Sequence, residues 1–472
     1  MKYILPQKIV YTSGKVENAE KLLTSDRIQL ILNEPNLTYV DGKASIILDF
    51  GQETYGGIRI QNNTITDNIR CFVRVRFGES LNECSADIFE KNSFNHLSIR
   101  DLTIELAYST DFTFGNTGFR FVRLDFLTEN CKVGIKNIYG TSHIYENENV
   151  LYNYQGNDLR IKNIFNTAKH TIDLCAQGEF LWDGIKRDNI VWIGDMYPEM
   201  IAMTTLYGRV KIIEDSLNFV IGTTPKGAWV NGFPTYSLWY LIILSDYVKE
   251  TNAMDFLNSQ TEIIDRIVGQ MDECVLKNGE LNYPSYFVDW PTHKTEDEIP
   301  GVRAINIIAC KKTIEVLKLL NKDTALVEDI LNRLLLRPIE VKSKKQIIAL
   351  KYFAIGEISE QEKEMLMEGG VKGFSTFMSY FLFKTVAECV SPAIAIEMLK
   401  EYYGAMLDKG ATSFWEDFDI EWTENSCRID EFVKEGQIDI HGDFGKFCYK
   451  GFRHSLCHAW SCGIIKFIKE YC

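Results

Sequence analysis

The sequence predicts a multidomain β + α protein, with an amino-terminal antiparallel β-sandwich at residues 1–153 and an all-α region at residues 154–472. Two observations predict this division, a change of periodicity along the chain and the chain length. Apolar and polar residues alternate with a period of two in the first part, whereas apolar residues recur at i, i+3, i+4 and i+7 beyond residue 154. A chain of 472 residues is also too long for one ordinary core.

The strand-like segments of the first part are residues 44–50, 57–60, 71–77 and 119–124. Glycine, asparagine and aspartate separate them, as expected for turns of an antiparallel sheet. A short helix is expected near residues 16–23. The alternating arginines, Arg74 with Arg76 and Arg120 with Arg123, are interpreted as a solvated sheet face.

The second part contains ten segments with helical periodicity. Their loops alternate short with long, which favours paired helical hairpins that close on themselves. The expected helices are residues 157–177, 198–220, 236–249, 255–275, 304–320, 323–335, 344–354, 374–389, 391–407 and 455–470.

Long loops are expected at residues 183–199, 223–234, 278–302 and 408–452, and each holds tryptophan with acids or other polar groups. Loops longer than about 12–15 residues are usually functional or disordered, and their aromatic content argues against disorder. If these loops converge on one end of a helical barrel, they build one pocket.

The segment 182–199 is the most informative stretch. Carboxylates interleaved with tryptophan suit a sugar pocket, because acids move protons and indoles stack on the apolar face of a pyranose. A solvated loop with packed tryptophans is the alternative interpretation. The acids are Asp183, Asp188, Asp195 and Glu199, and they lie beside Lys186, Arg187, Trp182 and Trp192.

A second stretch, residues 410–422, can end a helix at Gly410 and then presents Trp415 and Glu416. Together with the first stretch it offers the two carboxyl groups that glycoside hydrolysis needs. Alone, it would be a helix exit with surface acids. The loop 287–291 adds Asp289 beside Trp290.

A third stretch, residues 453–461, places His454 and His458 four residues apart, so on a helix they would share a face. Three roles stay open: a bond to a sugar hydroxyl or a helix cap, a satisfied core histidine, or a metal pair. For the metal role, the segment lacks the glutamate of the H-E-x-x-H motif.

Composition excludes several classes of partner. A net charge of -14 and a pI near 5.2 argue against nucleic acid or an anionic membrane as a partner. We find neither a signal peptide nor a membrane-spanning apolar run. Twelve cysteines without a secretory signal indicate free thiols in the cytoplasm, and without a C-x-x-C pair we expect no metal site.

These motifs resemble the α-L-rhamnosidases of glycoside hydrolase family 78, a family of six-hairpin glycosidases. The resemblance implies a six-hairpin (α/α)6 barrel preceded by β-sandwich modules. The matching positions are Asp183, Arg187, Asp188, Trp192, Gly194 and Asp195 in the first family motif, residues 410–416 in the second, and Ser455, Leu456 and His458 in the third.

One departure concerns the general acid, which in the family is the glutamate of Arg-Asp-Glu-Arg. Counting from Arg187 places Asn189 at that position, whereas counting back from Trp192 places Asp188 there. An amide cannot deliver a proton, so Asp188 is the predicted acid and Glu199 a reserve candidate.

The resemblance implies an inverting enzyme without cofactor or metal that releases L-rhamnose from small glycosides or oligosaccharides. Asp188 would protonate the glycosidic oxygen while Glu416 activates water, with their carboxyl groups roughly 6.5–9.5 Å apart. Asp183, Asp195, His458 and Arg187 would bind ring hydroxyls, and Trp192, Trp290 and Trp415 would form an apolar wall for the C6 methyl group.

Two alternatives stay open. The shortened motif could reshape the pocket of a six-hairpin glycosidase for another sugar. Asn189 also raises the alternative of a non-hydrolytic carbohydrate-binding protein that kept the pocket and lost the acid.

Overall fold

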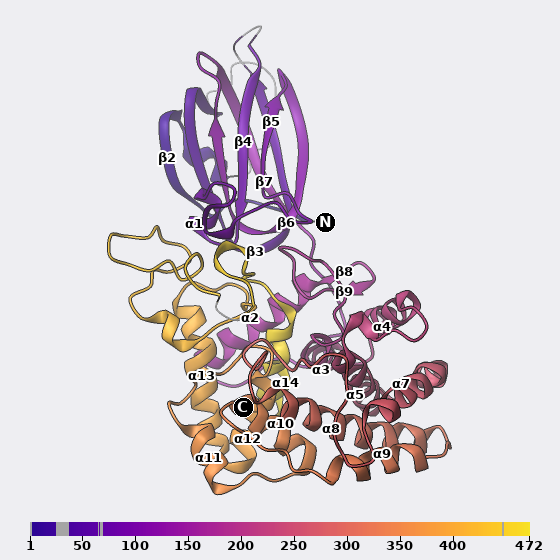
Figure 1. Ribbon diagram of the computed structural model, residues 1–472. Coiled ribbons are helices and arrows are strands. Elements are labelled where there is room, and N and C mark those ends of the chain that lie inside the picture. Colours follow the sequence, from indigo (N-terminus) through magenta and orange to yellow (C-terminus); the bar gives the residue numbers. More distant parts are fainter. Residues whose placement is uncertain (1, 25–36, 65, 67–68, 446–447) are drawn as a thin grey trace.

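The computed structural model describes residues 2–24, 37–64, 66, 69–445 and 448–472. Its first part is an antiparallel sheet with the strand order β1-β7-β3-β6-β4-β5, in which β2 pairs with β3 (Figure 1). We call residues 2–142 the sheet region. The strands are β1 (Lys2–Ile4), β2 (Lys8–Glu17), β3 (Thr38–Thr64), β4 (Cys71–Gly78), β5 (Asp101–Leu106), β6 (Ser109–Phe126) and β7 (Lys132–Ser142).

The long strand β3 determines the shape of this sheet. β7 pairs with residues 38–41 near the start of β3 and with residues 58–64 near its end. The pairing of β3 with β6 also shifts register between residues 49 and 58, and such irregularities bend a strand. The sheet therefore folds over its own apolar core, which includes Ile46, Phe119 and Ile138.

Two arginines expected on a solvated sheet face are buried instead, since Arg76 and Arg120 are only 4% and 6% exposed. Arg120 donates to both carboxylate oxygens of Asp49, at 2.8 and 2.9 Å. Its third bond goes to the carbonyl oxygen of Gly410, at 3.0 Å. The prediction was wrong because other segments cover these arginines: Gly410 lies over Arg120, and Arg76 donates to the carbonyl oxygens of Ser85 and Ala86.

The rest of the chain, residues 159–472, is largely helical, and we call it the helical region. Its described α-helices are α2 (Leu159–Cys175), α3 (Met196–Tyr207), α4 (Lys211–Thr223), α5 (Pro234–Thr251), α6 (Met254–Ser259), α7 (Thr261–Cys274), α8 (Glu298–Leu319), α9 (Ala325–Leu335), α10 (Lys345–Ile355), α11 (Glu360–Met367), α12 (Ser379–Cys389), α13 (Pro392–Asp408) and α14 (Ile464–Tyr471). The short strands β8 (Ala176–Gln177) and β9 (Phe180–Leu181) form a hairpin.

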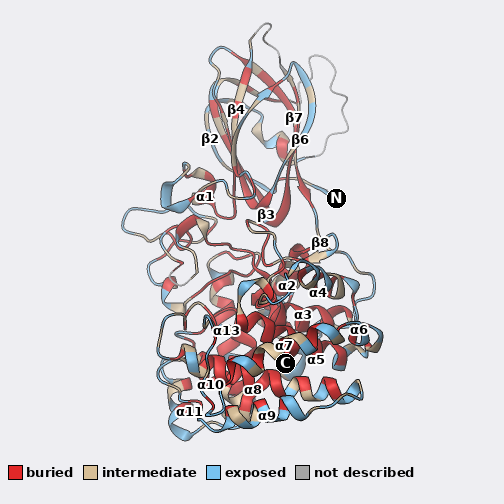
Figure 2. Cartoon of the chain, turned by 45° about the vertical axis from the view of Figure 1, so that its right-hand side comes forward, coloured by how far each residue is buried: buried red, intermediate tan, exposed pale blue. Residues whose placement is uncertain are grey.

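Among the described helices, α3, α5, α8, α10, α12 and α14 pack in a closed series in which each contacts the next and α14 contacts α3. The helices α3 and α5 are buried almost all round, as Figure 2 shows by colour. By contrast, α7 buries one stripe that contains Ile263, Ile267 and Met271. Helices that are apolar on every face lie inside a fold, and amphipathic ones lie outside.

Several helix predictions differ from the structure; residues 255–275, for example, form two helices, α6 and α7. The segment predicted at 198–220 is two helices, because Gly208 has a φ of 71° and ends α3. Helix α11 was missed: it is short and polar, and its start is fixed by a capping box between Ser359 and Glu362. The last helix begins only at Ile464, after the 3-10 helix η6 (Ala459–Gly463).

The sheet region contacts the loop that precedes α3. The N–H group of Gly118 donates to the carbonyl oxygen of Ile185 at 2.9 Å. A Cβ atom at position 118 would lie 2.8 Å from Cγ1 of Ile185, so the close approach requires glycine. The loop with the four sequence-predicted acids is therefore packed against the sheet.

Two further features of the described residues concern helix length and the cysteines. None of the helices there combines the length and the apolar content that a membrane span requires. The twelve cysteines are all free thiols.

Candidate active site

A cavity of about 390 Å³ lies where the long loops of the helical region meet. Its size falls within the range of small-molecule sites. The lining residues are Asp183, Arg187, Asp188, Trp192, Asp195, Phe233, Tyr236, Ser285, Tyr286, Phe287, Trp290, His293, Glu416, Cys448, Tyr449, His458 and Trp460. All the sequence-predicted site residues are among them except Trp415.

Arg187 joins the two predicted catalytic carboxylates. Its Nη1 donates to Oδ2 of Asp188 at 2.6 Å, and its Nη2 donates to Oε2 of Glu416. Its Nε donates to the carbonyl oxygen of Arg453 at 2.9 Å, and its guanidinium lies 3.9 Å from the ring centre of Tyr449. Bonds in three directions fix this side chain, so it orients both carboxylates.

Glu416 is an ionised carboxylate inside the protein. Its Oε2 also accepts from the N–H group of Ser455 at 3.0 Å, and its Oε1 accepts from the thiol of Cys448 at 2.8 Å. Burial would raise the pKa of this carboxyl, but the Arg187 guanidinium and then His458 outweigh burial and hold the pKa well below its usual range. Glu416 therefore keeps its charge at neutral pH.

The turn at residues 188–189 places Asp188, not Asn189, in the cavity. Both residues have positive φ, 61° and 53°, a conformation that Asp and Asn tolerate better than most residues. The Asn189 amide turns back and donates to the carbonyl oxygen of Gly184 at 3.3 Å. The side chain of Asp188 is 16% exposed, against 2% for that of Glu416. Asp188 is thus the carboxyl with more access to solvent.

Two further acids, Asp183 and Asp195, line the cavity and are buried. Burial is the main cause that raises the pKa of each well above its ordinary value, and for Asp195 the charges of Asp183 and Glu416 add to it. Both carboxyls are therefore neutral over a wider pH range than usual and can donate hydrogen bonds. Burial likewise raises the pKa of Glu199, which is not among the lining residues.

The two histidines have different surroundings. His458 lines the cavity, with Nε2 3.9 Å from both Asp183 and Glu416. Burial lowers its pKa to about 4, so its imidazole is neutral at pH 7. His454 instead accepts the backbone N–H of Asp417 at 2.9 Å. The two do not share a helix face, because the helix predicted from residue 455 begins only at Ile464.

Among the described residues, the group that could hold a metal ion is not this histidine pair. It consists of Glu79, Glu83 and His441, outside the cavity lining.

Aromatic side chains form a large part of the cavity wall. Trp192 and Trp290, the two tryptophans predicted to line an apolar wall that are among the lining residues, are half-buried there. Phe287 packs edge-on against Trp290, with ring centres 5.3 Å apart. The cavity therefore combines acids with aromatic rings, the combination that pyranose binding requires.

Neither a family model nor a curated protein matches this sequence. Solved structures do match. The structure described as a rhamnosidase from Klebsiella oxytoca with rhamnose bound aligns with a TM-score of 0.77 and 18% identity, over 100% of this chain and 95% of that one. The chain has the fold of a rhamnosidase.

Two larger proteins share this fold. The GH78 family rhamnosidase of Bacillus sp. GL1 gives a TM-score of 0.72 at 17% identity and covers 95% of this chain. The α-L-rhamnosidase from Dictyoglumus thermophilum gives 0.65 at 14% identity over 99% of this chain. The present chain spans 48% and 51% of their lengths.

Within the rhamnosidase fold, Trp415 corrects one sequence prediction. It is completely buried, and its ring packs edge-on against Phe418 at 5.5 Å. Its neighbour Glu416 lines the cavity, whereas Trp415 is not among the lining residues. Trp415 therefore supports the segment from behind and does not line the cavity.

Sequence reasoning missed nine lining residues. Phe287 and His293 lie three residues from Trp290, and Trp460 lies two residues from His458, so proximity to the motifs could have found them. The others carry no comparable signal, because common residue types reach the cavity only through the fold. The missed residues are Phe233, Tyr236, Ser285, Tyr286, Phe287, His293, Cys448, Tyr449 and Trp460.

Proposed function

We propose that this protein is an inverting glycoside hydrolase that releases terminal L-rhamnose from α-L-rhamnosides. The observation that carries the proposal is the pair Asp188 and Glu416, held on one guanidinium in a cavity with an aromatic wall. The fold shared with a rhamnose-bound rhamnosidase agrees with this chemistry. An acid and a base on one site are what hydrolysis of a glycosidic bond needs.

Glu416 acts as the general base in this proposal. It accepts a proton from a water molecule, whose oxygen attacks the anomeric carbon from the face opposite the leaving group. Its low pKa keeps the carboxylate free of protons, and bonds from Arg187, Ser455 and Cys448 fix its direction.

Asp188 acts as the general acid and donates its proton to the glycosidic oxygen as the bond to the anomeric carbon breaks. A leaving group projects towards the opening of a pocket, and Asp188 is more exposed there than Glu416. In the empty site its carboxylate forms an ion pair with Arg187. The bound glycoside is proposed to draw Asp188 away from Arg187 and towards the glycosidic oxygen.

The buried carboxyls are proposed to recognise the sugar. Neutral Asp183 and Asp195 donate hydrogen bonds to ring hydroxyls, and neutral His458 accepts or donates one. Trp192 and Trp290 contact the ring and its C6 methyl group.

The finer architecture belongs to the same proposal. The closed helix series supports an (α/α)6 barrel at residues 154–472. The sheet folded over its own core supports a β-sandwich domain at residues 1–153. The free thiols support a cytoplasmic location, with small imported rhamnosides or oligosaccharides as substrates.

The test is hydrolysis of aryl glycosides headed by the α-L-rhamnoside, with wild type, Glu416→Ala and Glu421→Gln compared. Glu421 lies in the same loop but is 57% exposed and pairs with Lys372, so it is a matched control. We expect turnover by wild type and Glu421→Gln, and a loss of about 10²–10⁴-fold in Glu416→Ala. The first product seen by NMR should be β-L-rhamnose.

The other outcomes are decisive as well. Activity on a different sugar would keep the mechanism and change the specificity. If no glycoside is hydrolysed but sugar binding is retained, the result would favour a non-hydrolytic binding protein. A first product with retained α configuration would overturn the inverting mechanism.

A further inference from the structure

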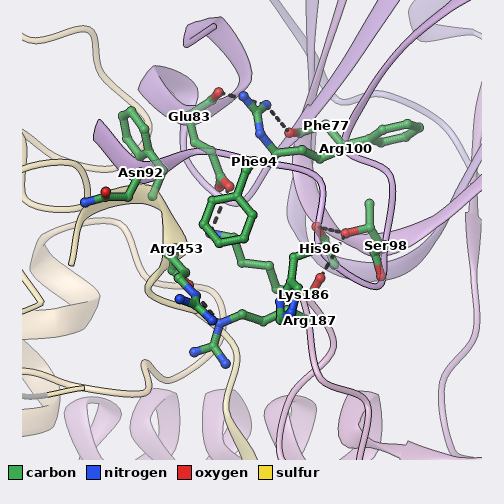
Figure 3. Close-up of a pocket in the computed structure, with 13 residues that line it drawn as sticks. Phe77, Glu83, Asn92, Phe94, His96, Ser98, Arg100, Lys186, Arg187 and Arg453 are labelled. Atoms are coloured by element: carbon green, nitrogen blue, oxygen red, sulfur yellow. Dashed lines mark hydrogen bonds and ion pairs between the residues drawn. The ribbon is translucent and has the colours of Figure 1, made fainter. Parts of the chain in front are cut away.

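A buried cluster of titratable side chains lies between the sheet region and the loops of the proposed active site. It consists of Glu79, Glu83, Lys186 and His441, and both glutamates are at most 1% exposed. Figure 3 shows part of this junction, where Glu83 of the sheet region lies near Lys186 of the helical region. The proposed mechanism uses none of these groups.

The Lys186 ammonium group is the cation at the centre of this cluster. Its Nζ lies 2.8 Å from Oε1 of Glu83 and 3.3 Å from Oε2 of Glu79. The same Nζ lies 3.4 Å from Nε2 of His441 and donates to the carbonyl oxygen of His454 at 2.9 Å. The possible metal ligands thus already have a cation within bonding distance, so we assign no metal to them.

Glu79 also reaches the segment that holds the proposed base. Its Oε2 accepts the N–H group of Leu456 at 2.6 Å, and its Oε1 accepts the hydroxyl of Ser455 at 3.1 Å. Ser455 and Glu416 are joined by two bonds: the Ser455 N–H donates to the Glu416 carboxylate, and the Glu416 N–H donates to the Ser455 carbonyl, each at 3.0 Å. Ser455 therefore links Glu79 directly to the carboxylate of Glu416.

A second path runs from Glu79 through Lys186. The neighbour of Lys186 in the chain is Arg187, which binds both Glu416 and Asp188. Glu79 shares this second path with Glu83, whose Oε1 lies closer to the same lysine, so the contact that Glu79 alone makes is the one to Ser455 and Leu456. Buried charges in low dielectric hold such geometry tightly, because breaking one pair leaves its partner uncompensated.

We propose that Glu79, a residue of the sheet region, is a positioning residue that sets the carboxylate of Glu416 relative to Asp188. The sheet region is then part of the catalytic apparatus and not a separate accessory module. This inference rests on the proposed hydrolase function, and its tests include one that needs no activity.

The kinetic test compares Glu79→Gln with Glu83→Gln. Glu83 is the matched control, because it contacts the same lysine while its other bond goes to the N–H group of Glu79. We expect Glu79→Gln to lower kcat about 10–100-fold with KM within about twofold, since a displaced base misaligns the attacking water. Glu83→Gln should stay within about threefold of wild type. Equal losses in both variants would overturn the proposal.

A double variant separates positioning from simple destabilisation. In the Glu416→Ala background the base is already absent, so Glu79→Gln should cause no further loss of residual rate. A further loss of tenfold would show that Glu79 acts elsewhere. If Glu79→Gln does not fold by circular dichroism, Ser455→Ala removes one bond of the same link and receives the same measurements.

Alkylation of Cys448 by iodoacetamide reports on Glu416 without any turnover. The Cys448 thiol donates to Glu416, and burial together with the charge of Glu416 raises the pKa of that thiol. Displacement of the carboxylate in Glu79→Gln should therefore speed alkylation at least about threefold, as should Glu416→Ala, whereas Glu83→Gln should match wild type. An unchanged rate in Glu79→Gln would refute positioning even if wild type hydrolyses no glycoside.

Discussion

Arg187 and Glu416 form an ion pair in which both side chains are buried, 5% and 2% exposed. The same guanidinium binds Asp188. The proposed acid and base are therefore held in one network before any sugar enters. A buried pair of this kind does more to set geometry and charge than to stabilise the fold, because desolvation offsets much of its attraction.

Replacing Arg187 tests this network. Arg187→Met removes the charge that most lowers the pKa of Glu416, so burial should raise that pKa and move the acidic limb of kcat/KM to higher pH. Arg187→Lys keeps the charge but cannot bind two carboxylates as a fork, so it should lower kcat about 10²-fold with a smaller shift. Arg428→Lys, at a half-exposed arginine that pairs with Asp430, is the control. Identical pH profiles for wild type and Arg187→Met would contradict the assignment.

The choice of Asp188 as the acid can be tested with leaving groups of different basicity. Asp188→Asn should lose about 10²–10⁴-fold on rhamnosides whose leaving group needs a proton, and much less on a dinitrophenyl rhamnoside. Asp195→Asn should lose activity equally on both substrates, because it removes a contact to the sugar. If the loss of activity depends on the leaving group in Asp195→Asn and not in Asp188→Asn, Asp195 is the acid.

Asn189→Ala provides the matched control for the same turn. Its amide bonds to the backbone of Gly184, away from the cavity, so activity should fall less than about threefold.

The sequence predicted the helical and strand periods well because both depend on local burial patterns. The predicted strand at residues 71–77 corresponds to β4, and the predicted helix at residues 236–249 corresponds to most of α5. Two of the departures in the helical region depend on backbone geometry. Gly208 ends α3 at a positive φ, and the residues after Ser455 are held by Glu416 and Glu79 before a helix can start.

The candidate site was predictable where function requires charged or indole side chains in loops. Asp183, Asp188 and Glu416 reach one cavity although more than 220 residues separate the first two from the third. The contribution of Glu79 could not be predicted, because an acid on a strand-rich segment resembles any surface carboxylate. Only the packing of the two regions shows that it is buried against Leu456.

Asp195→Asn is expected to stabilise the fold. Burial and then the charges of Asp183 and Glu416 raise the pKa of Asp195, so between about pH 4 and this raised pKa the folded chain binds more protons than the unfolded chain. The free energy of unfolding therefore falls as pH rises through this window. In Asp195→Asn this pH-dependent loss is absent, because asparagine does not ionise. We expect Tm at pH 7 to rise by about 2–4 °C and to match wild type below about pH 4.

Thermal unfolding at a series of pH values checks this expectation. Asp215→Asn, at a partly buried acid of α4 that pairs with the exposed Lys211, should leave Tm unchanged. A lower Tm for Asp195→Asn at pH 7 would mean that the carboxyl is stabilised in its charged form.

Trp290 is expected to select the C6 methyl group of the sugar. Its half-buried indole offers apolar surface in the cavity, and one methyl contact in such a pocket is worth about 10–200-fold in kcat/KM. Trp290→Ala should therefore lower kcat/KM for an aryl α-L-rhamnoside more than for the α-L-mannoside, which carries a hydroxyl group at C6. Trp422→Phe, at a buried tryptophan stacked on Phe444 and not among the lining residues, should leave the ratio unchanged. An equal loss on both sugars would assign Trp290 to the ring and leave the methyl group to another residue.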